Sequence, residues 1–352
     1  MKKIIKHILY GVLLFDATAL LASEAYAPVA YGVKSRGMGG VGIATEHGAE
    51  SGFENPALLS YLNKNEVSLG ITYDNPSRKL EDSSGSYDMR AEDTYIPYFA
   101  LNYKIGESLG LGLTLSKVKF QNDLVDDIST DIQKTRATIP LSYRFDNLSF
   151  GASFVVEKEK YIINNFTFST TDYGFVLGAA YRFPQQGIMV AANYKSKIDH
   201  SFFATDHHFD LNSASEAGVG LHWKIPNSKS SIALDYKRIY SSKIYTSEAN
   251  PAASTYFDDQ NVYALGYSYD RRKWSFRAGY RYVSFLYKQD LLSRGYPYVS
   301  KSHYSIGGSY RFNKNFSSDF AVVYAPYSRT LDDGSTLTSD ETSCSISLNY
   351  TF

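Results

Sequence analysis

Apolar and polar residues alternate along most of the chain, and the final segment shows this pattern most clearly. One face of that segment would carry Cys344, Ile346, Leu348, Tyr350 and Phe352. Serine, asparagine and threonine fill most of the positions between them. Residues 273–283 repeat the pattern with aromatic residues on the apolar face. An alternation with period two predicts β-strands that have one apolar and one polar face.

Fourteen segments of this kind can be counted. They centre near 65–74, 93–104, 108–120, 133–145, 147–159, 172–183, 187–198, 214–224, 230–240, 260–269, 273–283, 302–312, 316–325 and 341–352. Most have about the length that a tilted strand needs to cross a bilayer. No stretch beyond residue 22 approaches the ~20 apolar residues of a spanning helix. Because lipid cannot satisfy an open sheet edge, strands in a membrane must close into a barrel.

The connections between these segments alternate in length. Six are short and rich in Gly, Asn, Asp or Pro, and seven are long, such as residues 199–213 and 241–259. Outer-membrane barrels have short periplasmic turns and longer external loops. The sequence therefore predicts an all-β fold, a 14-stranded antiparallel transmembrane β-barrel over residues 63–352, with Phe352 on the periplasmic side.

The N-terminus is typical of a signal peptide. Three lysines precede an apolar run that ends in small residues. We expect residues 1–22 to be removed, with cleavage near Ala22 and with Ala27 as the alternative. A transmembrane anchor is disfavoured because the run is short and contains Asp16.

Residues 23–62 do not alternate and contain a glycine-rich run followed by Asn55-Pro56-Ala57. A dinucleotide-binding loop would need a strand before the glycines and a helix after them, which this chain does not predict. Glycines also let a backbone turn and pack closely. We therefore expect residues 23–62 to form an N-terminal hatch, or plug, inside the lumen.

The composition fits this picture, with 31 Tyr and 21 Phe against 2 Trp. Tyrosine suits the boundary between lipid and water because its ring is apolar and its hydroxyl is wet. Lys plus Arg and Asp plus Glu both number 36, so no basic excess points to a nucleic acid. Cys344 is the one cysteine, which excludes an intrachain disulfide. We expect no cofactor, and a monomer whose partners are outer-membrane lipid and lipopolysaccharide.

Several segments resemble the FadL/TodX family of outer-membrane transport proteins. The stretch from Tyr31 to Ala57, with its Ser-Arg-Gly-Met-Gly-Gly-Val-Gly run, resembles the N-terminal hatch of that family. Residues 233–236, 276–280, 303–312 and 319–326 resemble the family as well. The family has fourteen strands, which agrees with the number counted from the alternation.

The resemblance implies passive uptake of hydrophobic molecules, such as long-chain fatty acids or hydrocarbons, across the outer membrane of a Gram-negative bacterium. The ligand would bind outside, move to a site in the barrel, and leave sideways into the lipid when the hatch shifts. The expected hatch or gate residues are Gly37, Gly39, Gly40, Gly42, Asn55, Pro56 and Ala57. Candidate ligand contacts in the long connections are Phe166, Phe168, Phe202, Phe203 and Phe209. The third strand, with Gly110 and Gly112, is a candidate for the lateral opening.

Other functions remain open at this point. The barrel could be a structural protein, an adhesin or an assembly partner without transport, or it could be a general porin. An enzyme is not expected, because no G-x-S-x-G motif and no suggestive Ser/His/Asp set occurs. His200, His207 and His208 share one connection with Asp206 and Asp210, which could hold a metal, but we expect no metal there.

Overall fold

The computed structural model describes residues 27–89, 93–123, 129–163, 166–204, 207–247, 257–286, 300–330 and 334–352. The signal peptide expected at residues 1–22 lies outside the described residues. Among the helices of the described part, none combines the length and the apolar character required to span a membrane.

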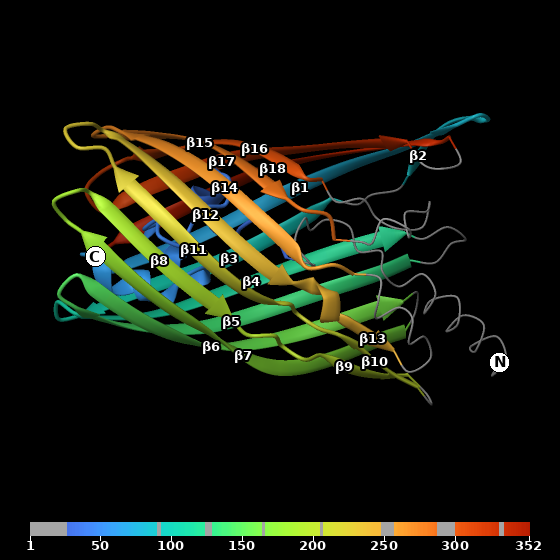
Figure 1. Cartoon of the computed structure of the whole chain (residues 1–352), viewed down its shortest axis with the longest axis horizontal. Helices are drawn as coiled ribbons and strands as arrows, with labels where there is room; N and C mark the ends of the chain where they lie inside the picture. The colour runs from blue at the N-terminus through green and yellow to red at the C-terminus, as the bar shows by residue number, and fades with distance from the viewer. Residues whose placement is uncertain are drawn as a thin grey trace.

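Fourteen antiparallel strands close into a barrel within the described residues (Figure 1). In chain order they are β1 (Glu66–Asp82), β3 (Thr94–Ile105), β4 (Leu109–Asp123), β5 (Ser129–Phe145), β6 (Leu148–Ile163), β7 (Phe166–Phe183), β8 (Ile188–Lys195), β11 (Ser215–Lys224), β12 (Ser230–Tyr240), β14 (Gln260–Asp270), β15 (Trp274–Val283), β16 (Ser302–Arg311), β17 (Phe316–Thr330) and β18 (Thr336–Thr351). The last strand returns to pair with the first, with Glu66 opposite Thr351. The predicted 14-stranded barrel is confirmed.

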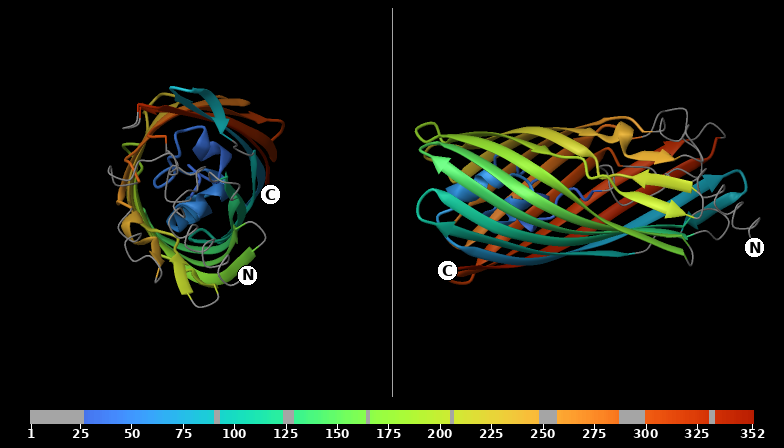
Figure 2. Two further views of the ribbon diagram at one scale, coloured as in Figure 1. Left: turned by 90° about the vertical axis from the view of Figure 1, so that its right-hand side faces the viewer. Right: turned by 90° about the horizontal axis from the view of Figure 1, so that it is seen from below.

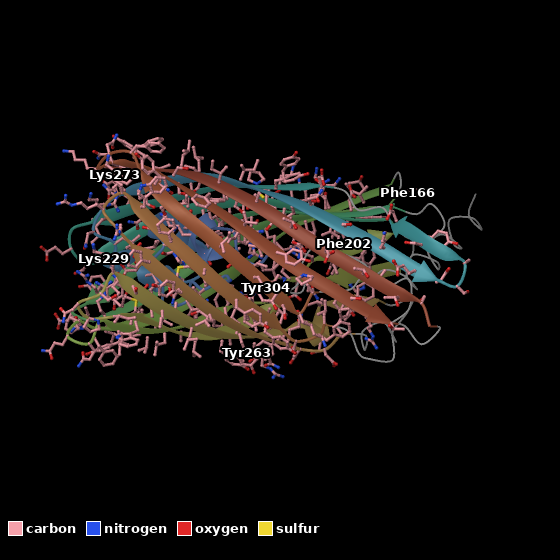
Figure 3. The ribbon with its side chains drawn as sticks, turned by 90° about the horizontal axis from the view of Figure 1, so that it is seen from above. Phe166, Phe202, Lys229, Tyr263, Lys273 and Tyr304 are labelled. Atoms are coloured by element: carbon pink, nitrogen blue, oxygen red, sulfur yellow. The ribbon has the colours of Figure 1, made fainter. Side chains whose placement is uncertain are left out.

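The outer surface of the barrel is apolar because alternate side chains of each strand point away from the lumen. On β18, Ile346 and Leu348 are exposed whereas Ser345 and Ser347 are buried. Exposed tyrosines also lie side by side on neighbouring strands, as where Tyr263 of β14 pairs with Tyr282 of β15. Figure 3 labels Tyr263 and another exposed tyrosine, Tyr304 of β16. This arrangement suits a barrel whose outer face contacts lipid and whose aromatic side chains reach the headgroups.

The two ends of the barrel differ. The C-terminus lies at the end where short turns join the strands (Figure 1). The tightest of these turns is Asp146-Asn147 between β5 and β6, where Asp146 has a φ of 50°. Such a positive φ suits the twist of a two-residue hairpin.

At the opposite end, the expectation of long loops is wrong for several connections. The β6–β7 hairpin stays paired up to Ile163 opposite Phe166, and β17 pairs with β18 up to Thr330 opposite Thr336. A continuing ladder satisfies backbone groups that a loop would leave to water, so these hairpins extend as strands. Residues 85–89 add the short strand β2 (Gly85–Met89) beside β1.

Two further connections form a small sheet at the same end. It consists of β9 (Ser201–Ala204), β10 (His207–Leu211) and β13 (Tyr245–Ser247). The candidate ligand contacts expected in loops therefore lie on strands. Phe166 and Phe168 belong to β7, and Phe202, Phe203 and Phe209 belong to β9 and β10.

The N-terminal segment lies inside the barrel, as Figure 2 shows in the view along the barrel axis. It contains α2 (Val33–Arg36) and two 3-10 helices, η1 (Gly48–Phe53) and η2 (Pro56–Tyr61). Apolar side chains of this segment, such as Val41, Ile43 and Leu58, are fully buried. We call residues 27–62 the hatch below.

Candidate functional site

The glycine-rich run lets the hatch press directly against the wall. Gly39 and Gly40 have φ values of 70° and 80°, which side chains rarely adopt. The backbone N–H of Gly39 donates to the Ser305 hydroxyl at 2.8 Å. A Cβ at Gly39 would lie 2.9 Å from the backbone nitrogen of Tyr280 on β15. These glycines are therefore needed for contact with the barrel wall, whatever further role they have in gating.

A single carboxylate of the wall holds the next turn of the hatch. Asp235 of β12 accepts hydrogen bonds from the backbone N–H groups of Gly42 at 2.7 Å and Ile43 at 2.9 Å. Both bonds are buried, where charge-assisted bonds to a carboxylate are strong. Gly42 thus contributes a backbone donor to the contact between hatch and wall.

Glu54 joins the hatch to two strands through an ion-pair cluster. Its carboxylate lies 3.0 Å from Lys195 Nζ on β8 and 3.2 Å from Lys237 Nζ on β12. Burial alone would raise the pKa of this carboxyl, but the two ammonium groups outweigh that effect and lower it to about 2. Lys195 also pairs with Glu216 at 3.3 Å, so the cluster is shared between acids and lysines.

The Asn55-Pro56-Ala57 motif begins η2 and fixes it to the wall. The Asn55 side chain accepts from the Ala57 N–H at 3.1 Å, and its amide donates to the Ile43 carbonyl at 2.8 Å and the Ala192 carbonyl at 3.3 Å. Pro56 stands at the first helical position, where its missing N–H costs nothing. A Cβ at Gly178 of β7 would clash with the Asn55 side-chain oxygen, so a glycine makes room for the motif.

The β4–β5 hydrogen-bond ladder of the wall is interrupted beside η2. Pairing between β4 and β5 runs up to Leu111 opposite Leu141 and resumes at Thr114 opposite Thr138. Between these pairs, Gly112 and Leu113 have no partner on β5 among the described residues. Pro140 lies in this break, and a proline has no N–H to donate to the ladder.

The hatch covers this break from inside. A Cβ at Gly112 would lie 2.8 Å from Cγ of Pro140 and 2.9 Å from Cδ1 of Leu59, and one at Gly110 would lie 2.8 Å from the Leu59 carbonyl carbon. Both glycines therefore face η2 directly. The structure brings the candidate opening and the candidate gate together.

Beyond the hatch, the lumen is apolar. We call this cluster of buried side chains the apolar layer. It comprises Ile96, Val118, Ile132, Tyr161, Phe202, Phe209, Leu211, Ile239, Ile244, Tyr245, Phe257, Val262, Val283 and Leu286. Seven barrel strands contribute lumen-facing residues to it, so the faces of these strands that point into the lumen are apolar at this level. Tyr31 of the hatch packs against the layer, which links the two regions.

The five phenylalanines named from the sequence separate into two groups. Phe202 and Phe209 are buried in the apolar layer with ring centroids 5.2 Å apart, and Phe168 packs on Phe209 at 6.1 Å. Phe166 and Phe203 are 51 % and 75 % exposed. Figure 3 labels Phe166 and Phe202 towards the end of the barrel that lies opposite the short turns. The alternation along β9 explains why Phe202 and Phe203, although adjacent, face opposite sides.

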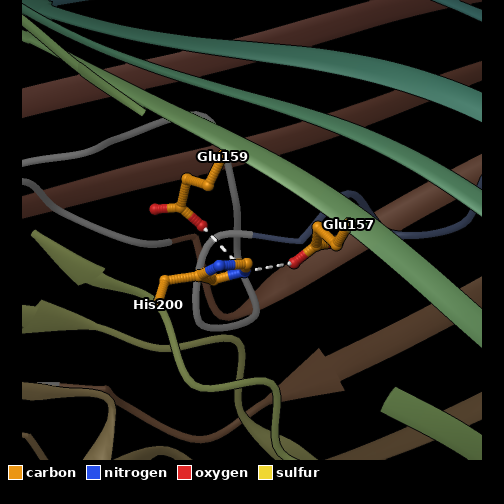
Figure 4. Close-up of side chains that lie close together, drawn as sticks. All are labelled: Glu157, Glu159 and His200. Carbon is orange, nitrogen blue, oxygen red and sulfur yellow. Dashed lines mark hydrogen bonds and ion pairs between the residues drawn. The ribbon is translucent and has the colours of Figure 1, made fainter. Parts of the chain in front are cut away.

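An ionic network lies next to the apolar layer. Figure 4 shows Glu157 and Glu159 of β6 with His200, which comes from the connection between β8 and β11. His200 Nε2 lies 3.0 Å from Glu157 and 3.5 Å from Glu159. Arg136 and Lys134 of β5 pair with Glu157 and Glu159 at 2.6 and 3.2 Å. The sequence analysis grouped His200 with His207 and His208 of the same connection. Its carboxylate partners lie about forty residues earlier in the chain, where no local spacing could reveal them.

These ligand-type atoms lie within 4.8 Å of one another, a spacing that a metal ion could bridge. The two cations of β5 each pair with one of these two glutamates, however, so neither glutamate needs a metal ion to balance its charge. The remaining residues of the candidate metal group lie apart from it. His208 pairs with Asp210 at 2.9 Å within β10, and Asp206 lies outside the described residues.

A polar cavity of about 950 Å³ lies on the other side of the hatch, near the short turns. Its lining includes Lys34, His47, Glu66, Lys224, Arg277 and Asn315. The lumen therefore changes from polar to apolar across the hatch. An apolar solute that followed the axis would have to cross this charged cavity.

Comparisons with known proteins agree with this geometry. Residues 27–168 match the family described as outer membrane protein transport protein (OMPP1/FadL/TodX). The resemblance to the FadL/TodX family is confirmed. That family is described as one of outer-membrane transport proteins, and the barrel fold of this chain agrees with the description.

Solved FadL/TodX structures share the fold. The Pseudomonas putida toluene transporter TodX is 17 % identical, with 94 % of this chain and 100 % of that chain covered and a TM-score of 0.73. A Pseudomonas aeruginosa FadL homologue is 16 % identical, with 91 % and 98 % covered and a TM-score of 0.74. The Ralstonia pickettii toluene transporter TbuX is 18 % identical, with 92 % and 98 % covered and a TM-score of 0.70. No curated protein matches the chain in sequence.

Proposed function

We propose that this protein takes up uncharged hydrophobic molecules passively across the outer membrane. Residues 23–62 act as its hatch, and residues 63–352 form the barrel domain. The observation that carries the proposal is the apolar layer, which lies in the lumen directly beyond the hatch. Moving an apolar solute out of water is favourable by ~0.8 kcal/mol per buried CH₂, so the uptake needs no other energy source.

Exit to the side, through the break beside Gly112, completes the proposed path. Two observations support it: the β4–β5 ladder is interrupted where η2 touches the wall, and the cavity between the hatch and the short turns is polar. A shift of η2 away from Gly110 and Gly112 would uncover the break. The solute would then pass into lipid without crossing the charged cavity. The filled lumen favours this function over a general porin.

The charges beside the apolar layer favour neutral solutes over fatty acids. Lys134 and Arg136 are each paired with a buried glutamate. A carboxylate ligand would have to break one of these pairs, and breaking a buried pair costs about 3–5 kcal/mol. Alkanes and aromatic hydrocarbons need no such rearrangement.

The hatch can be tested with a disulfide lock. A Cβ at Gly37 would lie 3.5 Å from Cβ of Ala321 on β17, which is within the range that a disulfide accepts. Gly37→Cys with Ala321→Cys, in a Cys344→Ser background, should stop uptake of a labelled alkane into vesicles that carry lipopolysaccharide. Reduction should restore it. Uptake that is equal with and without the protein would remove the proposal, and uptake unaffected by the lock would remove the movement of the hatch.

Solute selectivity can be tested at Glu159. Replacing Glu159 with Gln removes the carboxylate that lies 3.2 Å from Lys134 Nζ, so binding of a fatty acid should rise about tenfold relative to an alkane of equal length. Glu216→Gln, which alters an ion pair at the level of the hatch, is the matched control. A wild-type protein that already binds the acid more tightly than the alkane would contradict the preference for neutral solutes.

A further inference from the structure

The barrel wall has a second weak place, between β7 and β8. Their ladder ends at Val176 opposite Lys195. Two bonds follow it: the Ser196 N–H donates to the Phe175 carbonyl at 2.9 Å, and the Phe175 N–H donates to the Ser196 hydroxyl at 2.9 Å. Residues 166–174 of β7 have no strand partner on this side among the described residues, because β9 pairs with β10 instead. A free strand edge is what a closed barrel normally avoids.

The connection between β8 and β11 (residues 196–214) turns into the lumen at this place. Ile198 and Ser213 pair with each other, with backbone bonds of 3.1 and 3.0 Å, and both are buried. Gly174 of β7 makes room for this connection, because a Cβ there would lie 2.7 Å from Cγ1 of Ile198. The connection thus covers the free edge of β7 from inside without forming a ladder with it.

His200 fastens the connection to the wall. Its Nδ1 lies 2.9 Å from Asp172 Oδ2 on β7, and its Nε2 lies 3.0 Å from Glu157 Oε1 on β6. Both ring nitrogens face carboxylate oxygens, which only accept hydrogen bonds. A neutral imidazole can donate to one of them, whereas an imidazolium donates to both.

The charges around the ring also favour a protonated His200. Three carboxylates face it or its partners, from Glu157, Glu159 and Asp172. Two cations come from β5, Lys134 and Arg136. A protonated His200 makes the count three against three, and a neutral ring would leave the charge of Asp172 uncompensated.

We propose that the gap beside β7 is a side entrance from the outer surface to the apolar layer, and that His200 latches it shut while protonated. The proposal rests on the proposed function, since it adds an entrance to the same path. Tyr173 and Phe175 are exposed on the outer face of β7 where the gap begins, and Phe202, two residues after the latch, is buried in the layer. A solute at the level of the lipid headgroups would therefore reach the apolar layer without passing the small sheet of β9, β10 and β13.

The latch has a definite pH dependence. Burial opposes charging of the ring, but the hydrogen bond to Glu157 and the charge of Glu159 outweigh it, so the pKa of His200 is raised. The latch is therefore complete below the ordinary histidine pKa and is lost as the pH rises through the raised value. Entry through the gap should increase in the same direction.

The test compares the pH profile of uptake in three proteins. In the wild type, alkane uptake should rise roughly tenfold between about pH 5 and about pH 9 as the closed population is lost. His200→Gln should give high uptake with little dependence on pH. His208→Gln, which changes a histidine paired within β10, should keep the wild-type profile. Equal profiles in the wild type and His200→Gln would overturn the latch.

A second variant keeps the side entrance testable if the histidine replacement disturbs folding. Gly174→Cys with Ile198→Cys, in the Cys344→Ser background, places one sulfur where Cγ1 of Ile198 now meets the glycine. The oxidised protein should lose the rise in uptake at high pH, and reduction should restore it. Unchanged uptake in the oxidised form would exclude this entrance. If the hatch lock still stops uptake in that case, the proposed function stands. If the wild type takes up nothing at any pH, the proposed function itself fails.

Discussion

The lumen on the two sides of Tyr31 is held together by different kinds of contact. Towards the short turns, the hatch is held by directional polar contacts, such as the two N–H groups on Asp235 and the lysines around Glu54. Towards the outer end, apolar side chains from seven strands and the small sheet fill the space. Hydrogen bonds fix one geometry, whereas the hydrophobic effect is non-directional. The comparison favours the proposal that the polar region closes the path and the apolar region accepts the solute.

The polar region can be broken most strongly at Glu54. Glu54→Ala would leave Lys195 and Lys237 buried without this carboxylate, and removing one partner of a buried pair costs about 3–5 kcal/mol. The hatch should become accessible to protease while the barrel stays folded. Glu46→Ala is the control, because the Glu46–Arg182 pair is partly exposed and such pairs contribute about 0–1 kcal/mol. Equal protease sensitivity of the two variants would show that the Glu54 cluster does not hold the hatch.

The apolar region can be probed with two adjacent phenylalanines. Phe202→Ala removes a ring that is 2 % exposed. It should destabilise the small sheet of β9, β10 and β13 by about 3 kcal/mol and lower the affinity for the solute. Phe203→Ala removes a ring that is 75 % exposed and should change stability by less than about 0.5 kcal/mol. Thermal melts and solute titration of both variants measure the difference. Similar losses in the two would mean that the layer is not the binding region.

Acid should destabilise the hatch and stabilise the His200 latch, because their titrating groups respond in opposite directions. Burial lowers the pKa of His47 in the hatch to about 3, despite its bond to the Val41 carbonyl. The stability that this neutral histidine contributes is present above its ordinary pKa and is lost as the pH falls towards the lowered value. The stability contributed by the ionised Glu54 is lost in the same direction, at lower pH, because its pKa is also lowered. We expect the hatch to loosen by roughly 1–3 kcal/mol on acidification while the His200 latch tightens. Protease digestion at several pH values, compared with His47→Gln, measures this, and a hatch that grows more resistant in acid would contradict it.

The smallest effect is expected on the outer face. Cys344 is exposed on the lipid-facing side of β18. Cys344→Ser should leave melting temperature and uptake unchanged within about 0.5 kcal/mol. A larger loss would show that the outer face makes a contact beyond lipid, such as with a second copy of the chain.

The alternation was enough to predict the barrel, because lipid demands an apolar side chain at every second position. The hatch could be predicted as well, since its residues break that alternation and its glycines suit close packing. The apolar layer left a weaker signal. Ile239 shares the lumen-facing parity of Asp235 and Lys237, and Ile132 shares that of Lys134. Apolar residues on the polar face near strand ends could have revealed it.

The latch and the wall break could not be predicted in the same way. His200 meets Glu157 and Asp172 from a connection whose path into the lumen depends on the length of its neighbours. Sequence distance says nothing about such a meeting. The break beside Gly112 depends on Pro140 in the next strand, and only the register of the two strands brings these residues together.

Arg36 has a consequence for biogenesis. Its guanidinium bonds to Asp74 of β1 at 3.2 Å and to Ser343 of β18 at 2.5 Å, and these two residues face each other where the first strand meets the last. The docking position is incomplete until the final strand has been delivered by the insertion machinery. This contact of the hatch therefore forms only when the cylinder closes, and a half-assembled protein lacks it.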